Sequence, residues 1–146
     1  SQKTYFFRGS MVYLYNDKLM KMEAGYPKLI DDVFKGVPNN INAAFTWGKD
    51  GSTYFFKGPF YYKYNDKSNK VERGYPKRTN KRWGGMPKII NAIFTLPYNL
   101  DDTSNPTGTY VISGASVYYI HPINDKVKKI GDISERFSGL DVIENK

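Results

Sequence analysis

The side chains that could carry out covalent chemistry are few in this sequence. His121 is its single histidine, and cysteine is absent. The sequence contains no Gly-x-Ser-x-Gly, no phosphate-binding loop and no His-x-x-x-His pair, so the common nucleophile, phosphate and zinc chemistries lack their parts. Carboxylates are paired at residues 31–32 and 101–102, but neighbours in sequence seldom share one site, and a solvated helix face and a polar loop explain them better. The sequence therefore predicts a protein that is not an enzyme.

Charge is more informative than catalysis. The chain of 146 residues has a formal net charge of +8. Residues 41–89 carry eleven basic and three acidic side chains, whereas residues 1–40 carry six and four, and residues 90–146 carry five and seven. The middle third therefore holds an excess as large as that of the whole chain. Its candidate binding residues are Lys67, Lys70, Arg73, Lys77, Arg78, Lys81 and Arg82.

This basic cluster has two interpretations. The first is a solvated face without a partner. The second is a site for a polyanion, namely a sulfated glycan, an acidic protein or an anionic membrane, to which clustered exposed cations are attracted. Nucleic acid is a minor option, because the aromatic residues between the cations are at strand spacing and are expected in the core.

An internal repeat predicts the structural units in which these residues lie. Three segment pairs are each separated by 49 residues: 4–9 and 53–58, 25–28 and 74–77, and 41–46 and 90–95. A looser third copy retains residues 109–114 and 124–126, and residues 140–143 resemble the start of a unit once more. We therefore expect a single domain over residues 1–146, with units at about 1–40, 41–89 and 90–139 and a closing strand at 140–146.

Each unit reads as several short strands followed by one short helix. Ile-Asn-Ala-Ala-Phe-Thr and Thr-Tyr-Phe-Phe-Lys-Gly are separated by a Lys-Asp-Gly turn, which is a hairpin signal. Pro76 fits the first turn of a helix that continues to about Trp83, and Gly84 ends it. The Tyr-Phe-Phe strands carry aromatics on both faces, so both faces should be covered. Small sheets stacked as in a propeller meet that need.

The residues in these motifs resemble hemopexin-like repeats, which occur in hemopexin, vitronectin and the C-terminal domains of matrix metalloproteinases. The resembling motifs are Asn-Ala-Ala-Phe, Thr-Tyr-Phe-Phe-Lys-Gly, Tyr-x-x-Tyr and Gly-Tyr-Pro-Lys-x-Ile-x-x-x-Phe-x-Gly-x-Pro. The resemblance implies an all-β fold, a small β-propeller with a short helix after each blade's outer strand, and a secreted protein that binds rather than catalyses. The family's usual four blades need one more unit than this sequence holds, and its terminal cysteine pair is absent.

The resemblance also implies sites for ions in a central channel. Backbone carbonyls at Asn42, Asn91 and Asp141 would hold a cation such as Ca²⁺, and the amides of Ala44, Ile93 and Ile143 would face an anion. A second interpretation is that Asn42, Asn91 and Asp141 only orient the strand ends through side-chain hydrogen bonds. Haem is an unfavoured ligand, because His121 falls at or beside the position of Asn16 and Asn65, where an exposed turn residue is expected.

The sequence thus predicts a secreted, non-enzymatic binding module that contacts an acidic protein or a sulfated glycan through its basic face. Two other classes remain open, namely a carrier of haem or an ion and a membrane-active defence protein. The similarity of residues 140–143 to the start of a unit leaves three arrangements open as well: a ring of three blades, a homo-oligomeric ring of two chains, and a fragment of a four-bladed protein.

Overall fold

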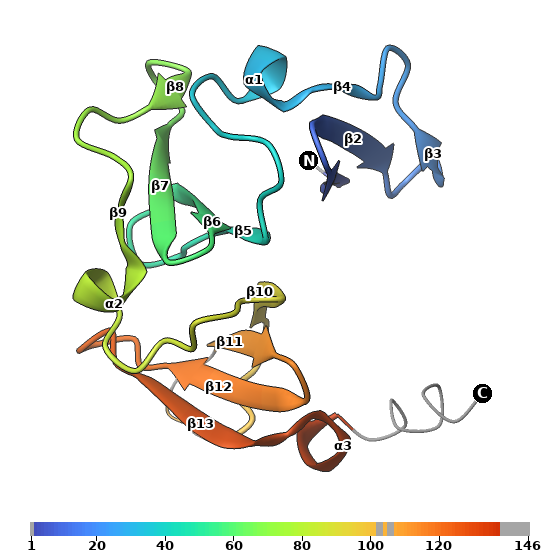
Figure 1. The fold of residues 1–146 in the computed structure, drawn as a ribbon. Coiled ribbons are helices and arrows are strands. Elements are labelled where there is room, and N and C mark those ends of the chain that lie inside the picture. Colours follow the sequence, from blue (N-terminus) through green and yellow to red (C-terminus); the bar gives the residue numbers. More distant parts are fainter. Residues whose placement is uncertain (1, 102–103, 105–106, 138–146) are drawn as a thin grey trace.

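A computed structural model describes residues 2–101, 104 and 107–137. Three antiparallel sheets follow one another along the chain and are arranged in an open arc (Figure 1). Strands β5 and β10, the first of the second and third sheets, contact each other on the inner side of this arc. The chain is therefore an all-β protein whose three sheets are arranged as propeller blades, as the repeat predicts. Among the described residues no helix has both the length and the hydropathy needed to cross a bilayer.

Each blade starts with hairpin-linked strands and ends in one turn of helix. The first blade comprises β1 (Lys3–Arg8), β2 (Met11–Asn16), β3 (Lys21–Met22), β4 (Lys28–Leu29) and α1 (Ile30–Val33). The second comprises β5 (Ala43–Thr46), β6 (Thr53–Lys57), β7 (Phe60–Asn65), β8 (Lys70–Val71), β9 (Lys77–Arg78) and α2 (Thr79–Arg82). The third comprises β10 (Ala92–Leu96), β11 (Gly108–Ser113), β12 (Ser116–Ile120), β13 (Val127–Asp132) and α3 (Ile133–Arg136).

The outer strand differs between the blades. In the first two it is divided into two short pieces, β3 with β4 and β8 with β9, on either side of the Gly-Tyr-Pro segment. The third unit lacks Gly-Tyr-Pro, and there β13 runs unbroken beside β12 with one register shift between Val117 and Tyr118. The loss of this motif in the third repeat thus removes the loop that interrupts the outer strand.

The predicted helix over residues 76–83 is wrong at its start. Lys77 and Arg78 form β9, which pairs with Tyr61 and Phe60 of β7, and helix α2 begins at Thr79. Arg78 keeps an extended conformation, with φ −74° and ψ 127°. Pairing of this segment with β7 therefore prevails over the preference of proline for a first helical turn.

Two aromatic cores lie between the blades. One joins the first and second blades around Val12, Ile30 and Phe55. The other joins the second and third blades, and at its centre Trp83 contacts Tyr61 with ring centroids 4.9 Å apart. Both faces of the second blade are buried, as expected for Tyr-Phe-Phe, because Phe55 is 1% and Phe56 0% exposed.

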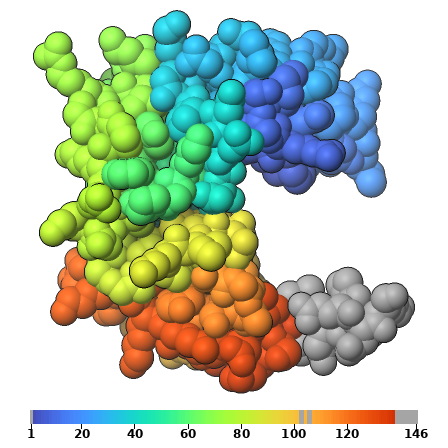
Figure 2. Space-filling view, in the orientation of Figure 1, coloured from blue at the N-terminus to red at the C-terminus, as the bar shows by residue number. Residues whose placement is uncertain are grey.

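The first blade does not follow this expectation within the described part of the chain. Phe6, which corresponds to Phe55, is 54% exposed, and Tyr5 is 43% exposed. Figure 2 shows the opening in the described molecule between the blue first blade and the orange third blade. Among the described residues, Phe6 has no cover like that which Val12 and Ile30 of the first blade give to Phe55. The predicted closing strand at 140–146 lies outside the described residues.

Candidate binding surface

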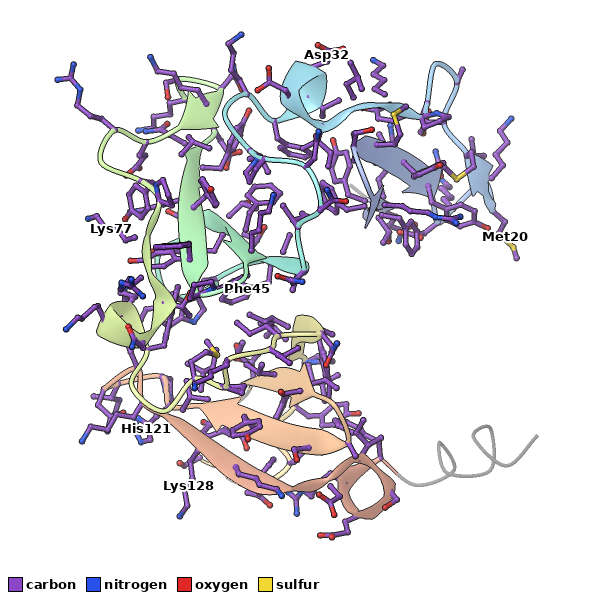
Figure 3. The ribbon with its side chains drawn as sticks, in the orientation of Figure 1. Met20, Asp32, Phe45, Lys77, His121 and Lys128 are labelled. Carbon is purple, nitrogen blue, oxygen red and sulfur yellow. The ribbon has the colours of Figure 1, made fainter. Side chains whose placement is uncertain are left out.

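The basic residues of the second unit follow the outer edge of the second blade rather than one side of a helix. Lys70 is on β8, Lys77 and Arg78 are on β9, and Lys81 is on α2. Figure 3 shows Lys77 at this edge, with its side chain directed away from the blade. We define the outer basic edge as the six exposed cations, namely Lys67, Lys70, Arg73, Lys77, Arg78 and Lys81.

Arg82 belongs to a different arrangement. Its guanidinium donates to the carboxylate of Asp125 at 2.5 Å and lies 4.9 Å from the ring centroid of Trp47. Lys49 binds the other carboxylate oxygen of Asp125 at 2.6 Å. Asp125 is in the third unit, whereas Arg82 and Lys49 are in the second, so these groups join two blades. Arg82 thus has a structural partner and does not belong to the outer basic edge.

The carboxyl group of Asp125 titrates below its ordinary range. Burial raises its pKa, but the hydrogen bonds and charges of Lys49 and Arg82 outweigh burial and lower the pKa overall. A carboxyl whose pKa is lower in the folded state stabilises the fold above its unfolded pKa of about 4. This contribution is lost as the pH falls through the folded value.

Replacing Asp125 by asparagine is therefore expected to cost about 2 kcal/mol of unfolding free energy at pH 7, because two cations lose a charged acceptor. The difference from the parent protein should narrow as the pH falls below about 4, where the unfolded carboxyl becomes protonated, and should vanish below the lowered pKa of the folded state, where the parent carboxyl is protonated in both states. Melting temperatures from pH 7 to pH 3 test this result. Asp32→Asn at an exposed position is the control. Equal melting curves for the two variants would contradict a stabilising role of Asp125.

Lys77 has a local contact that recurs in the repeat. Its ammonium lies 4.6 Å from the ring centroid of Tyr75, and Lys28 lies 4.8 Å from that of Tyr26. Cation–π contacts of this kind stabilise exposed sites by about 0.5–1 kcal/mol. Lys77 is therefore part of the repeated Gly-Tyr-Pro-Lys motif, whereas Arg73, Arg78 and Lys81 of the outer basic edge have no basic counterpart in the first unit.

The structure adds one cation that the sequence pattern misses. Lys35, which follows α1, forms a parallel bridge with Lys70, and its carbonyl accepts from the Val71 amide at 2.9 Å. This exposed lysine thus extends the outer basic edge toward the first blade. No sequence signal indicates it, because Lys35 lies in another unit and meets Lys70 only through the packing of adjacent blades.

The predicted channel residues meet at one hollow. A cavity of about 440 Å³ is lined by Asn42, Ala44, Asn91 and Ile93 together with residues of β1. The Asn42 side-chain oxygen accepts from the Gly58 amide and that of Asn91 from the Gly114 amide, both at 2.7 Å. These amide oxygens thus hold the strand ends, as the second interpretation predicts. The predicted cation ligand at Asp141 and the predicted anion ligand at Ile143 lie outside the described residues.

The described residues do not provide a side-chain cage for a cation. No group of three or more histidine, cysteine or acidic side chains converges in the described part of the chain. Because the side-chain oxygens of Asn42 and Asn91 already accept hydrogen bonds, the described residues would bind a cation there through backbone carbonyls. Coordination by these groups stays a prediction.

His121 occupies the turn after β12, at the position of Asn65 in the second blade. Ile120 pairs with Thr109 as Tyr64 pairs with Thr53, so the next residues correspond. The His121 Nδ1 atom accepts from the Ile123 amide at 3.2 Å, and the Asn65 side chain accepts from the Lys67 amide at 2.9 Å. His121 thus replaces an asparagine in a turn, and haem ligation by it is not supported by any described neighbour.

Curated relatives align with short parts of the sequence. Interstitial collagenase from Bos taurus is 41% identical over 46 residues, which are 32% of this chain and 10% of that protein. Stromelysin-1 from Equus caballus is 43% identical over 44 residues, which are 30% of this chain and 9% of that protein. The chain therefore spans about a tenth of the length of the curated relatives it matches, and their whole activities do not transfer to it.

Solved plant proteins share the fold over nearly the whole chain. The hemopexin fold protein CP4 from cow pea superposes with a TM-score of 0.74 at 19% identity and covers 98% of this chain and 68% of its own. LS24, a seed albumin from Lathyrus sativus, gives 0.71 at 21% identity, with coverages of 98% and 67%. A lectin from Cicer arietinum, described as having two metal binding sites, gives 0.71 at 20% identity, with coverages of 98% and 68%.

These structural similarities show the fold, and the family of the chain is shown by a match to a family model. The Hemopexin model matches residues 1–39 and 41–88. The match includes both complete copies of the Gly-Tyr-Pro-Lys motif and covers more than half of the chain. The chain therefore belongs to the hemopexin family.

Proposed function

We propose that this chain is a non-enzymatic, secreted binding module whose outer basic edge binds a sulfated glycan. The main observation behind the proposal is that the six cations of the outer basic edge are exposed and have no described ion-pair partner. Arg82 and Lys49, in contrast, form ion pairs with Asp125. Surface cations that no described carboxylate pairs with keep their attraction for an external anion.

The shape of the edge favours an extended polyanion. Its cations are distributed over β8, β9 and α2 instead of converging in a pocket (Figure 1). A linear chain with regularly spaced sulfates can contact successive positions along such an edge. Arg78 also has a rigid support, because its guanidinium carbon lies 5.3 Å from the Phe60 ring centroid. Secretion is part of the proposal and follows from the resemblance to hemopexin-like repeats.

Replacing Lys70, Arg78 and Lys81 together by serine should weaken binding to heparin about tenfold or more. Each exposed charge contact contributes on the order of 0.5 kcal/mol, and about 1.4 kcal/mol corresponds to a factor of ten. Elution from a heparin column at lower salt, together with calorimetric titration, measures the change. Binding by the parent protein should also fall steeply with salt, because exposed charges are screened.

The matched control is a triple serine variant at Lys18, Lys21 and Lys128. These lysines are exposed on the first and third blades, and Figure 3 shows Lys128 at a distance from the outer basic edge. The two variants have equal net charge. An equal loss of retention in both would show attraction by net charge alone and refute the site. If heparin retention is unchanged in the first variant but binding of an acidic protein or of anionic vesicles is reduced, the outer basic edge binds that partner and not a sulfated glycan.

The sequence also left open that the protein carries an ion. Its cation would be held by carbonyls of Asn42, Asn91 and Asp141, and its anion by amides of Ala44, Ile93 and Ile143. The metal sites named for the Cicer arietinum lectin belong to that protein. Ca²⁺ binding by this chain stays a prediction.

A further inference from the structure

A hollow opens beside the start of α2 on the second blade. It has a volume of about 350 Å³ and lies between the turn that joins β6 to β7, residues 78–80, and residues 86–88 of the connection to the third blade. Figure 1 shows α2 beside this connection. The volume is within the range of about 300–1,000 Å³ in which small organic ligands bind.

The polar side chains of the hollow are two cations, an amide and a hydroxyl. Arg78 and Lys88 provide the cations, Asn80 the amide and Thr79 the hydroxyl, and no carboxylate lines the hollow. Neither cation forms an ion pair with a carboxylate of the described residues. Donors of this kind, without a competing carboxylate, suit an anionic ligand.

Thr79 is buried in a way that the fold alone does not require. Its side chain is 5% exposed, and its Oγ1 atom is buried without a hydrogen-bond partner among the described residues. A buried hydroxyl without a partner destabilises a fold. Rotation between staggered rotamers redirects the hydroxyl of a threonine, so an acceptor in the hollow would supply the missing bond. The Thr79 amide cannot do so, because it donates to the Pro59 carbonyl at 3.0 Å.

The other two blades have an isoleucine in the place of Thr79. The amides of Ile30, Thr79 and Ile133 each donate to a carbonyl in the hairpin turn of their own blade, at 2.9, 3.0 and 2.8 Å, so the three positions correspond. Ile30 is fully buried, as is usual for an apolar residue at such a place. The hydroxyl is therefore particular to the second blade, where the hollow lies.

The charged and amide groups depart from the repeat in the same direction. Positions 29, 31 and 39 of the first blade are Leu, Asp and Asn, and the residues 49 positions later are Arg78, Asn80 and Lys88. The second blade thus gains two cations and loses a carboxylate around the hydroxyl that replaces an isoleucine. All four changes meet at one hollow, and each of them favours an anionic ligand.

We propose that this hollow binds one sulfated sugar unit, with its sulfate held by Arg78, Lys88 and the Thr79 hydroxyl. The inference rests on the proposed function and adds a defined subsite to the outer basic edge, because Arg78 belongs to both. A sulfate group accepts hydrogen bonds from guanidinium, ammonium and hydroxyl donors. Met86 and Pro87 are half-buried and provide apolar surface for the sugar ring beside the sulfate.

Two substitutions outside the outer basic edge test this subsite in the full chain. Thr79→Val removes a hydroxyl that has no described partner, so the melting temperature should be unchanged or higher. Lys88→Asn introduces the residue type of the first blade. Each should raise the dissociation constant of a sulfated heparin disaccharide about threefold or more, as for the loss of one hydrogen bond or charge contact. Lys18→Asn, at an exposed position of the first blade, changes the charge equally and should leave the constant unchanged.

Amide chemical shifts of isotope-labelled protein, followed during titration with the disaccharide, locate the site. Shifts should centre on Thr79, Asn80 and Lys88, and the same disaccharide without sulfate groups should cause none. Equal affinity for inorganic sulfate would refute a site for a sugar unit. Parent affinity in both variants, with heparin binding lost in the triple serine variant of the outer basic edge, would refute the subsite and leave the proposed function intact. Absence of heparin binding by the parent protein would refute the proposed function and the subsite with it.

Discussion

Replacing Gly85 by alanine is expected to destabilise the protein by more than about 3 kcal/mol, a loss at the upper end for single substitutions. Gly85 has φ +87°, and a Cβ atom there would lie 2.1 Å from the carbonyl oxygen of Val127. That oxygen is part of β13, and the Val127 amide donates to the Gly84 carbonyl at 2.7 Å. The clash cannot be relieved by rotation of a side chain, so the second and third blades must separate locally.

Gly74 provides the matched control. Its φ is +91°, and nothing lies within 4 Å of a Cβ atom at this position. Gly74→Ala therefore incurs only the left-handed backbone cost of about 1–2 kcal/mol. Urea unfolding of both variants, followed by circular dichroism, separates the clash from the backbone cost. Equal losses for the two variants would show that the junction at Val127 adapts without cost.

Much of the fold could be predicted because the repeat carries it. The spacing of 49 residues places the hairpins, and the alternating aromatics of β6 predict a blade covered on both faces, as Phe55 and Phe56 show. The start of α2 could not be predicted in this way. Pro76 favours a helix locally, but the pairing of Arg78 with Phe60 is a contact between segments that no local preference contains. Tertiary pairing thus sets the helix boundary.

Comparison of the repeat units also shows which basic residues of the candidate site have counterparts elsewhere, which composition alone does not show. Lys77 has an equivalent in Lys28, and both lie over a tyrosine ring, so comparison of the units separates this lysine from Arg78 and Lys81. Arg82 could not be separated in the same way. It departs from the repeat as the binding residues do, and its partner Asp125 stands 43 positions away in another unit. A departure from a repeat can therefore reflect either a binding site or a contact between unlike blades.

Replacing Trp83 by alanine is expected to cost about 3–5 kcal/mol, as for other large aromatic residues removed from a core. Trp83 is fully buried, and its ring centroid lies 5.3 Å from that of Tyr54 and 5.5 Å from those of Trp47 and Phe56. Alanine would leave a cavity at the centre of the core between the second and third blades. Urea unfolding followed by far-ultraviolet circular dichroism measures the loss without relying on tryptophan fluorescence.

Phenylalanine at position 83 separates the volume of the ring from its polar atom. Phe34 and Phe137 occupy the equivalent place after α1 and α3, so a phenyl ring suits this position of the blade. The Trp83 Nε1 atom is buried and has no hydrogen-bond partner among the described residues, and its removal therefore sacrifices no bond. Because the phenyl ring leaves part of the indole volume empty, we expect Trp83→Phe to cost on the order of 1–2 kcal/mol, clearly less than Trp83→Ala. A loss as large as that of Trp83→Ala would contradict this account, because it would mean that a phenyl ring at this position contributes nothing to the packing of the junction.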